Sequence, residues 1–415
     1  MTPTSLSTVR LTINGDRLNR RVAELANIGK LENGGVCRIA FTALDLQARN
    51  QVQSWMEDAG MTTRIDAAGN VIGRYAGQKD NALALATGSH IDTVPVAGAF
   101  DGCLGVLAGI EVVRTLRDHN MRLDHPIEVI VFSDEERSVI GSKAISGEVH
   151  EDPAYYVRLD GTSIENALVK VGGDWSKIET AQRNDIAAFV ELHVEQGGIL
   201  EHSQVPIGVV TGVVGQYRFA VKIKGRPNHA GTTPMHLRKD ALVAGAQIVL
   251  AVNRIAFETP GDQVATVGCL NVLPNATNTI PGEVELKIDL RDLSQSHLEQ
   301  LVEQLKAEIS AIAASTGTEI TLKQTLHILP TLAAPGIINA IAQVCQALNL
   351  PQMQLPSRAG HDAQEVGRIT DMGMIFIPSK AGISHSEEEY TSPEECTQGA
   401  NVLLQTFLRL DQMYR

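Results

Sequence analysis

The sequence has few cysteines and no paired-cysteine motif. The five cysteines among 415 residues are odd in number and form no CxxC pair; they are Cys37, Cys103, Cys269, Cys345 and Cys396. A disulfide framework needs an even set of cysteines in an oxidising compartment, and a cysteine zinc site needs close pairs. We therefore expect free thiols and a cytoplasmic protein.

Positive charge and long apolar runs are also scarce. Lys and Arg number 35 against 48 Asp and Glu, so the net charge is −13. This balance argues against non-specific nucleic-acid binding and against an anionic membrane surface, because both require a basic face. We expect no membrane span, since no apolar run approaches the necessary length, and we expect no signal peptide in residues 1–21.

What the sequence does contain is an alternation of apolar strands and helices, which is typical of α/β proteins. At 415 residues the chain exceeds the size of one hydrophobic core, so we expect two domains. Each early strand is followed by a polar loop. These strands are predicted at 82–88, 127–133 and 187–192, and the helices around them at 16–28, 43–59 and 104–117.

A different order begins near residue 212. Strand, helix, two strands, helix and strand follow one another over 212–328, which matches a ferredoxin-like βαββαβ unit. The earlier pattern resumes after Pro330. The sequence therefore predicts an α/β domain with a central mixed sheet from residues 1–211 and 329–415, and an inserted ferredoxin-like domain from residues 212–328.

Residues 88–102, GSHIDTVPVAGAFDG, contain the first candidate metal ligands. The segment follows a predicted strand, and Pro95 and the glycines around it indicate a loop. A loop at the carboxyl end of a strand is where an open α/β sheet usually carries its chemistry. If His90 and Asp101 converge, they form half of a metal site.

The ends of other strands contain the remaining candidates. Glu135 and Glu136 follow one strand, His193 follows the next, and His385 lies in a C-terminal loop. Imidazole and carboxylate groups are the ligands of Zn²⁺ and Mn²⁺ in hydrolytic sites, and five ligands with one shared carboxylate can hold two ions. A lone histidine near a strand end is more often an ordinary loop residue. The coincidence of all these groups at α/β strand ends favours a metallohydrolase.

Three acidic residues suggest roles around the metal site. Asp92 lies two residues from His90 and can accept its second ring N–H, which would fix the tautomer. Glu135 and Glu136 are adjacent, so their side chains leave the chain in different directions. One of the two can bind a metal ion while the other stays free as the general base.

Motifs along nearly the whole chain resemble the dinuclear-metal, M20-type amidase and peptidase superfamily, and specifically its hydantoinase/carbamoylase branch. The motifs are GSHIDTVPVAGAFDGCLGV, ELHVEQGGILE, NHAGTTPM, PNATNTIPG, IDLRD, AGHDA and GISHSEEEY. The resemblance implies two divalent ions bridged by Asp101, with the further ligands His90 and His193 at one ion and Glu136 and His385 at the other.

The resemblance also gives the inserted segment 212–328 a role as a lid and dimerisation domain. His229 in NHAGTTPM matches a family residue that reaches a neighbouring active site and stabilises the developing oxyanion. Gln196 and Asn278 match residues that hold the substrate. From the residues alone, His229 and Asn278 would be turn residues in loops.

Arg291, in the motif IDLRD, matches a third substrate-holding residue. Its planar guanidinium can bind both oxygens of a carboxylate at once. From the residues alone, a salt bridge with Asp289 or Asp292 is an equally good interpretation.

One stretch departs from the family pattern. Relatives usually follow the paired glutamates with Gly and a longer loop, whereas here Glu136 is followed by Arg137-Ser-Val-Ile and then Gly141. The shorter loop lies near the base and not among the metal ligands. It weakens any substrate preference taken from a single relative.

The predicted activity is hydrolysis of the ureido C–N bond of N-carbamoyl-L-amino acids by a metal-bridging hydroxide, with Glu135 as general base. Zn²⁺ and Mn²⁺ are the first candidates for the two ions, and Co²⁺ and Ni²⁺ suit the same ligands. The alternatives are an allantoate or ureidoglycolate amidohydrolase, an aminoacylase or aminopeptidase, and a metal-binding module without catalysis. The resemblance implies a homodimer joined through the inserted domain and a small ureido substrate that carries a carboxylate.

Overall fold

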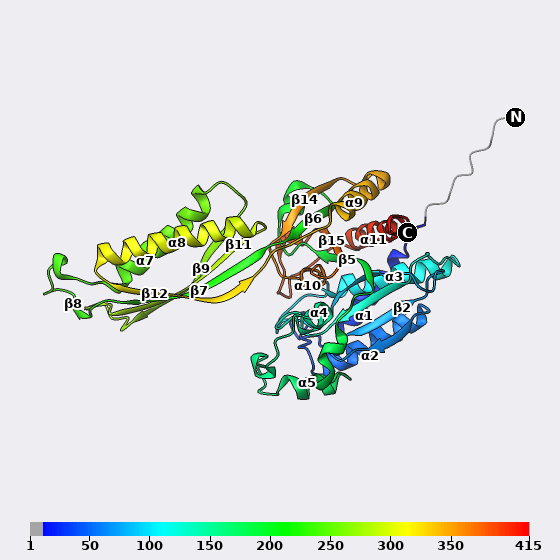
Figure 1. The fold of residues 1–415 in the computed structure, drawn as a ribbon, viewed down its shortest axis with the longest axis horizontal. Coiled ribbons are helices and arrows are strands. Elements are labelled where there is room, and N and C mark those ends of the chain that lie inside the picture. The colour runs from blue at the N-terminus through cyan, green and yellow to red at the C-terminus, as the bar shows by residue number, and fades with distance from the viewer. Residues whose placement is uncertain (1–10, 415) are drawn as a thin grey trace. The chain divides into compact units, whose positions relative to one another are not determined.

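The computed structural model describes residues 11–414, so part of the segment considered for a signal peptide lies outside the described residues. The chain divides into two compact units (Figure 1). Unit 1 comprises Met1–Gly212 and Leu332–Arg415, and unit 2 comprises Val213–Thr331. The proposed lid and dimerisation role of unit 2 stays a prediction.

A mixed nine-stranded sheet forms the centre of unit 1, in the order β1-β2-β4-β3-β5-β15-β6-β13, with β14 beside β6. The strands are β1 (Thr62–Ile65), β2 (Val71–Tyr75), β3 (Ala84–His90), β4 (Ile127–Phe132), β5 (Ile186–Val194), β6 (Ile207–Val213), β13 (Thr331–Leu332), β14 (Gln352–Ser357) and β15 (Asp371–Ile377). The four central strands β4, β3, β5 and β15 are parallel, and their neighbours β2 and β6 are antiparallel. The predicted α/β fold with a mixed sheet is confirmed.

Helices cover this sheet, and so the central strands are almost entirely buried. The helices are α1 (Gly15–Ala26), α2 (Ala43–Asp58), α3 (Cys103–Asp118), α4 (Ile140–Ser146), α5 (Ile164–Lys170), α6 (Ile199–Ser203), α9 (Pro335–Leu348), α10 (Asp362–Val366) and α11 (Pro393–Met413). Helix α3 is apolar on nearly all sides and lies within the hydrophobic core of the unit. Because α3 starts directly after the loop that follows β3, packing of this helix also holds that loop in place.

Unit 2 is a four-stranded antiparallel sheet with two helices, and its strand order is β12-β7-β11-β9. Its elements are β7 (Gly215–Lys224), β8 (Asn228–His229), α7 (Ala241–Glu258), β9 (Val264–Leu273), β10 (Thr279–Ile280), β11 (Glu283–Asp292), α8 (Gln295–Thr316) and β12 (Glu319–Ile328). Alternate residues of β7 and β11 face α7 and α8 and form a separate core. The predicted βαββαβ order of a ferredoxin-like domain is present.

One expectation needs correction, and one segment without a prediction forms regular structure. Helix α7 is long and apolar enough to cross a membrane by length and composition, although no such segment was expected. Its buried face packs on the sheet of unit 2, as in the core helix of a soluble domain. The segment 141–186, which shows no clear pattern in the sequence, forms α4, α5 and the short 3-10 helices Pro153–Tyr155 and Trp175–Ala181.

Candidate metal centre

The four parallel strands of unit 1 bring most of the candidate ligands to one edge of the sheet. His90 is the last residue of β3, Glu136 follows β4, His193 lies near the end of β5, and His385 lies in the loop after β15. Parallel strands end on the same side of a sheet, so residues that are far apart in the sequence meet there. The loop after β3 adds Asp101 to this group.

Asp101 lies between two groups of ligand atoms. The ligand atoms of His90, Asp101 and His193 lie within 4.8 Å of one another, and so do those of Asp101, Glu136 and His385. Oδ1 of Asp101 lies 3.2 Å from Nε2 of His193 and 3.8 Å from Nε2 of His90, while Oδ2 lies 3.3 Å from Nε2 of His385. Each oxygen of one carboxylate therefore faces a different group, as a bridging ligand requires.

The histidine ring orientations leave the correct nitrogen facing the cluster. Nδ1 of His90 lies 2.9 Å from the carbonyl oxygen of Asp92, and Nδ1 of His193 lies 2.9 Å from that of Val194. A carbonyl only accepts hydrogen bonds, so Nδ1 carries a proton and Nε2 is the nitrogen that is left to bind an ion. The sequence predicted that the Asp92 carboxylate would orient His90. The structure shows that the backbone carbonyl of Asp92 has this role instead, and the carboxylate lies 4.0 Å away.

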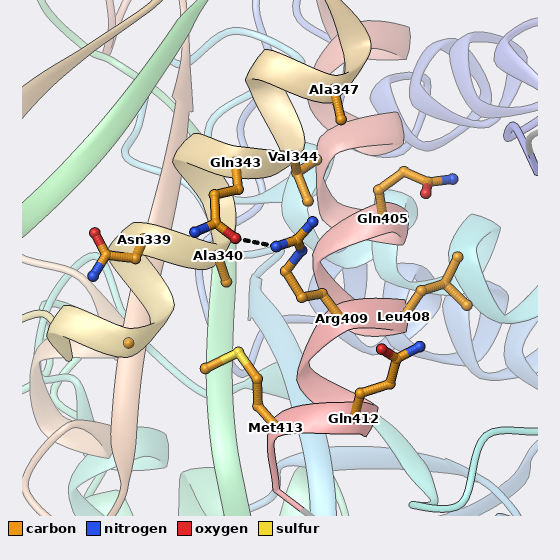
Figure 2. Close-up of a pocket in the computed structure, with 11 residues that line it drawn as sticks. Asn339, Ala340, Gln343, Val344, Ala347, Gln405, Leu408, Arg409, Gln412 and Met413 are labelled. Carbon is orange, nitrogen blue, oxygen red and sulfur yellow. Dashed lines mark hydrogen bonds between the residues drawn. The ribbon is translucent and has the colours of Figure 1, made fainter.

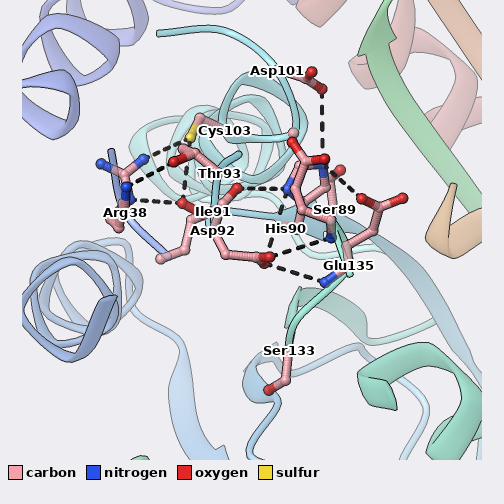
Figure 3. A network of polar contacts seen from close by, with 12 residues as sticks. Arg38, Ser89, His90, Ile91, Asp92, Thr93, Asp101, Cys103, Ser133 and Glu135 are labelled. Atoms are coloured by element: carbon pink, nitrogen blue, oxygen red, sulfur yellow. Dashed lines mark hydrogen bonds and ion pairs between the residues drawn. The ribbon is translucent and has the colours of Figure 1, made fainter. Parts of the chain in front are cut away.

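The Asp92 carboxylate instead holds the turn after β4. It accepts hydrogen bonds from the backbone N–H groups of Glu135 at 3.4 Å and Glu136 at 3.3 Å (Figure 3). Oε2 of Glu135 lies 3.6 Å from Nε2 of His90, yet Glu135 belongs to neither ligand group among the described residues. The two glutamates therefore diverge from a turn that Asp92 fixes.

The short loop after the paired glutamates is closed by its own backbone. The N–H of Val139 donates to the carbonyl oxygen of Asp134 at 2.8 Å, and Val139 has a positive φ of 51° before α4 begins. Arg137 turns away and donates from Nε to the carbonyl oxygen of Val157 at 2.8 Å. Helix α4 therefore begins directly after this short loop, at Ile140.

Charge in this cluster is unbalanced without a cation. Burial raises the pKa of Glu136 to about 7. Burial also raises the pKa of Glu135 well above its ordinary value. Burial alone would lower the pKa of His90, but the carboxylates of Glu135 and Asp92 raise it well above the usual value. The cluster thus retains protons at neutral pH that a metal ion could replace.

The chemistry of these groups fits divalent ions. Among the described residues, no donor reaches Oδ1 of Asp101 or Oε1 of Glu136 by a hydrogen bond, although both atoms are buried. Buried acceptors without partners are rare, and they suggest a group that the structure does not include. Imidazole nitrogens and carboxylate oxygens are ligands of Zn²⁺ and Mn²⁺, so the residues fit the implied ions.

Several residues of the site were not identified from the sequence. Oε1 of Glu389 accepts the backbone N–H groups of Phe100 at 2.9 Å and Asp101 at 3.1 Å, and its Oε2 accepts the hydroxyl of Ser384 at 2.9 Å. Glu389 therefore joins the loop after β3 to the loop that carries His385. The acidic run in GISHSEEEY was the available signal, but nothing local indicates which glutamate turns inward.

Glu191 is a second such residue and lies fully buried within β5. It accepts the hydroxyl of Ser89 at 2.7 Å and the N–H of Ala363 at 2.9 Å. A charged residue inside an otherwise apolar strand was the signal in the sequence. Glu191, His193 and His361 form a third group of ligand atoms, but both oxygens of Glu191 already have donors.

Gln196, expected to contact the substrate, instead contacts a metal-ligand candidate. Its Nε2 donates to Oδ2 of Asp101 at 2.9 Å, and its backbone has a positive φ of 56°. Its N–H donates to the hydroxyl of Ser379 at 3.0 Å. Such strained backbone is common at functional sites.

The remaining candidates belong to unit 2. Nδ1 of His229 accepts the N–H groups of Gly231 at 3.0 Å and Thr232 at 3.2 Å, so its Nε2 carries the proton and can donate. The backbone carbonyl oxygen of Asn278 accepts a hydrogen bond from the N–H of Ala230 at 3.0 Å, so Asn278 shapes the same exposed loop.

Arg291 forms the salt bridge that the residues alone allowed. Its Nε lies 2.8 Å from Oδ1 of Asp289, and its Nη2 lies 3.3 Å from Oδ2. Arg218 and Gln216 donate to the same Oδ2. Asp289 therefore binds the guanidinium group predicted for the substrate carboxylate.

A cavity of ≈ 680 Å³ lies elsewhere in unit 1, between α9 and α11 (Figure 2). A hydrogen bond from Arg409 to Gln343 crosses it. Its described lining residues include no acid, histidine or cysteine. It lacks the groups for metal or acid–base chemistry, so the metal cluster is the candidate site.

Comparisons with known proteins show the family of the whole chain. Residues 86–409 match the model of Peptidase family M20/M25/M40. The N-carbamoyl-L-amino acid amidohydrolase of Geobacillus stearothermophilus is 39% identical over 407 residues, covering 96% of this chain and 99% of that protein. The allantoate amidohydrolase of Bacillus subtilis (strain 168) is 35% identical, covering 93% of this chain and 95% of that protein. An amidase of the hydantoinase/carbamoylase family from Burkholderia multivorans has a TM-score of 0.91 at 36% identity, covering 96% and 98% of the two chains.

Proposed function

The chain belongs to peptidase family M20/M25/M40 and is an amidohydrolase that acts on C–N bonds in linear amides, and from that premise we propose that it cleaves the ureido C–N bond of N-carbamoyl-L-amino acids. The observation that carries the proposal is the position of Asp101, whose two oxygens face two separate ligand groups. The products would be the free amino acid, ammonia and CO₂.

Five side chains would hold the ions. His90 and His193 would bind one, Glu136 and His385 the other, and Asp101 both. When bound, two divalent ions lower the pKa of a water molecule and polarise the ureido carbonyl. We propose Zn²⁺ or Mn²⁺, with Co²⁺ or Ni²⁺ as the alternatives that the same ligands allow.

Glu135 is the proposed general base. It takes a proton from the attacking water and delivers it to the leaving nitrogen. Its Oε2 lies 3.6 Å from Nε2 of His90, beside the cluster and outside both ligand groups, where a free carboxylate is within reach of the water molecule. The turn held by Asp92 keeps Glu135 apart from Glu136, so that base and ligand remain separate groups.

Residues of unit 2 would bind the substrate. Protonated Nε2 of His229 suits donation to the developing oxyanion of a neighbouring active site. Arg291 would bind the substrate carboxylate in competition with Asp289, and Asn278 would add a further contact. Gln196 of unit 1 is the remaining proposed substrate contact. Allantoate is the second candidate substrate, because a relative that matches nearly the whole chain is named an allantoate amidohydrolase.

A homodimer joined through unit 2 is part of the proposal. Exposed apolar residues recur every seven positions along α7, where Val243, Leu250 and Phe257 are 49%, 70% and 90% exposed. Strand β9 forms one edge of the four-stranded sheet. An antiparallel edge strand can pair with its own copy across a two-fold axis, which would bury both the apolar residues of α7 and the edge of β9.

A cytoplasmic location is also part of the proposal, and the free cysteines support it.

Glu135→Gln tests the assignment of roles. This variant should lose turnover and keep its metal content, whereas Glu136→Gln should lose metal. Loss of metal in Glu135→Gln would overturn the roles assigned to the two glutamates. Ammonia release should be measured with carbamoyl amino acids, allantoate and ureidoglycolate, each with Zn²⁺, Mn²⁺, Co²⁺ and Ni²⁺. Cleavage of acyl amino acids or peptides alone would favour an aminoacylase or aminopeptidase, and no turnover in metal-replete protein would favour a binding module.

A further inference from the structure

Arg38 is a fully buried cation beside the loop that carries the metal ligands, and its side chain is only 1% exposed. Nε donates to the carbonyl oxygen of Ile91 at 2.7 Å. One terminal nitrogen donates to the carbonyl oxygens of Leu25 at 3.1 Å and Ile28 at 2.7 Å, and the other lies 3.1 Å from Sγ of Cys103. The guanidinium group thus fastens α1 to two points of the ligand loop.

The backbone of Arg38 adds a third point. Its N–H donates to the hydroxyl of Thr93 at 2.7 Å, and its carbonyl oxygen accepts the N–H of Thr93 at 3.0 Å. Figure 3 shows Arg38 against Ile91, Thr93 and Cys103. Ile91 directly follows His90, and Cys103 comes two residues after Asp101, so the contacts bracket both candidate ligands.

The loop transmits these contacts to the ligands. Gly102 lies between Asp101 and Cys103 with a positive φ of 65°, and a Cβ there would be 2.4 Å from Nε2 of His90. The His90 ring therefore packs directly on the backbone next to Cys103. A shift of the backbone at Gly102 and Cys103 would therefore alter the packing of that ring.

The energetics of Arg38 make a purely structural role costly. Among the described residues, no carboxylate forms a salt bridge with Arg38, whereas the equally buried Arg49 pairs with Asp45 at 3.0 Å. A buried charge without an opposite partner is strongly disfavoured. Carbonyl oxygens and a thiol offset that penalty only in part. The charged group that faces Cys103 in this network is the guanidinium of Arg38, which counteracts the rise that burial causes in the pKa of that thiol.

We propose that Arg38 is a positioning residue that holds the loop bearing His90 and Asp101 in its metal-binding shape before an ion arrives. A guanidinium group can do this because its rigid fork contacts several acceptors at once. A lysine ammonium is a single point and cannot span Ile91, Cys103 and the end of α1. This inference rests on the proposed metal centre and is independent of the substrate.

The test measures metal affinity in full-length protein stripped of metal. Mn²⁺ and Zn²⁺ are titrated into wild type, Arg38→Met and Arg38→Lys. Arg183→Met is the control, because the Arg183 side chain is only 8% exposed and forms salt bridges with Glu128 and Asp185 outside the cluster. Thermal unfolding without metal shows how far each variant is destabilised.

We expect Arg38→Met to weaken metal affinity by roughly tenfold or more, about 1.4 kcal/mol. Arg183→Met should lower the Tm to a similar extent and leave the affinity unchanged. Arg38→Lys should bind metal nearly as poorly as Arg38→Met. At saturating metal the KM of Arg38→Lys for the substrate should equal that of wild type, since only the metal requirement changes.

Unchanged affinity in both Arg38 variants, or full recovery by lysine, would overturn the proposal. If Arg38→Met fails to fold, Cys103→Ala removes one contact and should weaken metal binding by a smaller factor. An unchanged affinity in both Arg38→Lys and Cys103→Ala would then overturn it. Wild-type protein that binds no metal would instead contradict the proposed function, so the two failures are distinguishable.

Discussion

Nε2 of Gln196 donates a hydrogen bond to Oδ2 of Asp101 over 2.9 Å. The hydroxyl of Ser384 lies at the same distance from that oxygen. A residue expected to hold the substrate therefore also orients the carboxylate predicted to bridge two ions. Its left-handed backbone, with φ of 56°, aims the side chain at Asp101.

Replacing Gln196 by Ala should weaken metal binding as well as substrate binding. A hydrogen bond to a charged group contributes about 1.5–3 kcal/mol, so we expect a loss of roughly tenfold or more in metal affinity. Chelator competition measures it. Gln204→Ala is the control, because Gln204 also has a positive φ, of 54°, but caps α6. A raised KM with unchanged metal affinity would limit Gln196 to the substrate role.

Without metal, the protein should become less stable as pH rises. Between the ordinary value of 4.5 and about 7, folded Glu136 keeps a proton that the unfolded chain has lost. His90, with a pKa raised above 6.5, does the same above that pH. Both groups make the folded state bind more protons, so stability falls with rising pH by at most about 1.4 kcal/mol per pH unit for each group.

Added Mn²⁺ should reverse this trend, because metal binding displaces those protons and so becomes more favourable at higher pH. The measurement is the Tm with and without Mn²⁺ at pH 5.5, 6.5 and 7.5 (about one unit apart, to resolve a slope). In Glu136→Gln the pH dependence of the metal-free protein should be shallower. A Tm of metal-free wild type that rises over this range would contradict the assignment.

Local pattern was sufficient to place most ligand candidates. His90, Glu136 and His193 each lie at the end of an apolar strand, and an apolar run next to a polar residue can be read from a few neighbouring positions. Glu389 could not be placed in this way, because its hydrogen bond to the N–H of Asp101 joins residues 288 positions apart. Contacts of that kind depend on how whole elements pack.

The conformation of loop backbones could not be predicted from the sequence either. Whether His90 bonds the carbonyl or the carboxylate of Asp92 depends on dihedral angles in a loop, which residue types alone do not specify. Strand β14 was not expected, because its sequence QMQLPS contains Pro356 and lacks a strong apolar pattern. By contrast, the turn Asp66–Asn70 joins β1 and β2 as an antiparallel pair, as its turn residues predict.

Arg291→Ala should raise the KM for N-carbamoyl amino acids without changing metal content. Loss of a charged, two-point contact to a carboxylate costs about 1.5–3 kcal/mol, which corresponds to roughly 10- to 100-fold in KM. Initial rates over a range of substrate concentrations measure this effect. Arg218→Ala is the control, because Arg218 also pairs with Asp289 but is 51% exposed. An unchanged KM in Arg291→Ala would refute the carboxylate contact.

Asp289→Asn examines the competition for Arg291. Because Asp289 holds Nε of Arg291 at 2.8 Å, removing its charge should free the guanidinium for the substrate and lower the KM several-fold. A large increase in KM would show that Asp289 mainly orients Arg291. The same rate measurements distinguish the two roles.

The apolar stripe on α7 should mediate the proposed dimer. Leu250→Glu and Phe257→Glu place charges at positions that are 70% and 90% exposed, so neither should unfold unit 2, but both should prevent association. Light scattering gives the mass. Leu237→Glu is the control, because Leu237 is 62% exposed in the same unit but lies off α7. Unchanged mass in both α7 variants would exclude this helix as the interface.

If His229 acts in a neighbouring active site, two inactive variants should restore each other. In a mixed dimer of His229→Ala and Glu135→Gln, one site combines an intact Glu135 with the partner's intact His229. Random mixing makes half of all dimers mixed, each with one complete site, so activity should recover to about a quarter of wild type. The same mixture made with Phe257→Glu in both chains should stay inactive, because subunits that do not associate cannot share a site. No recovery in the first mixture, with mixed dimers verified by two affinity tags, would place His229 in its own subunit's active site instead.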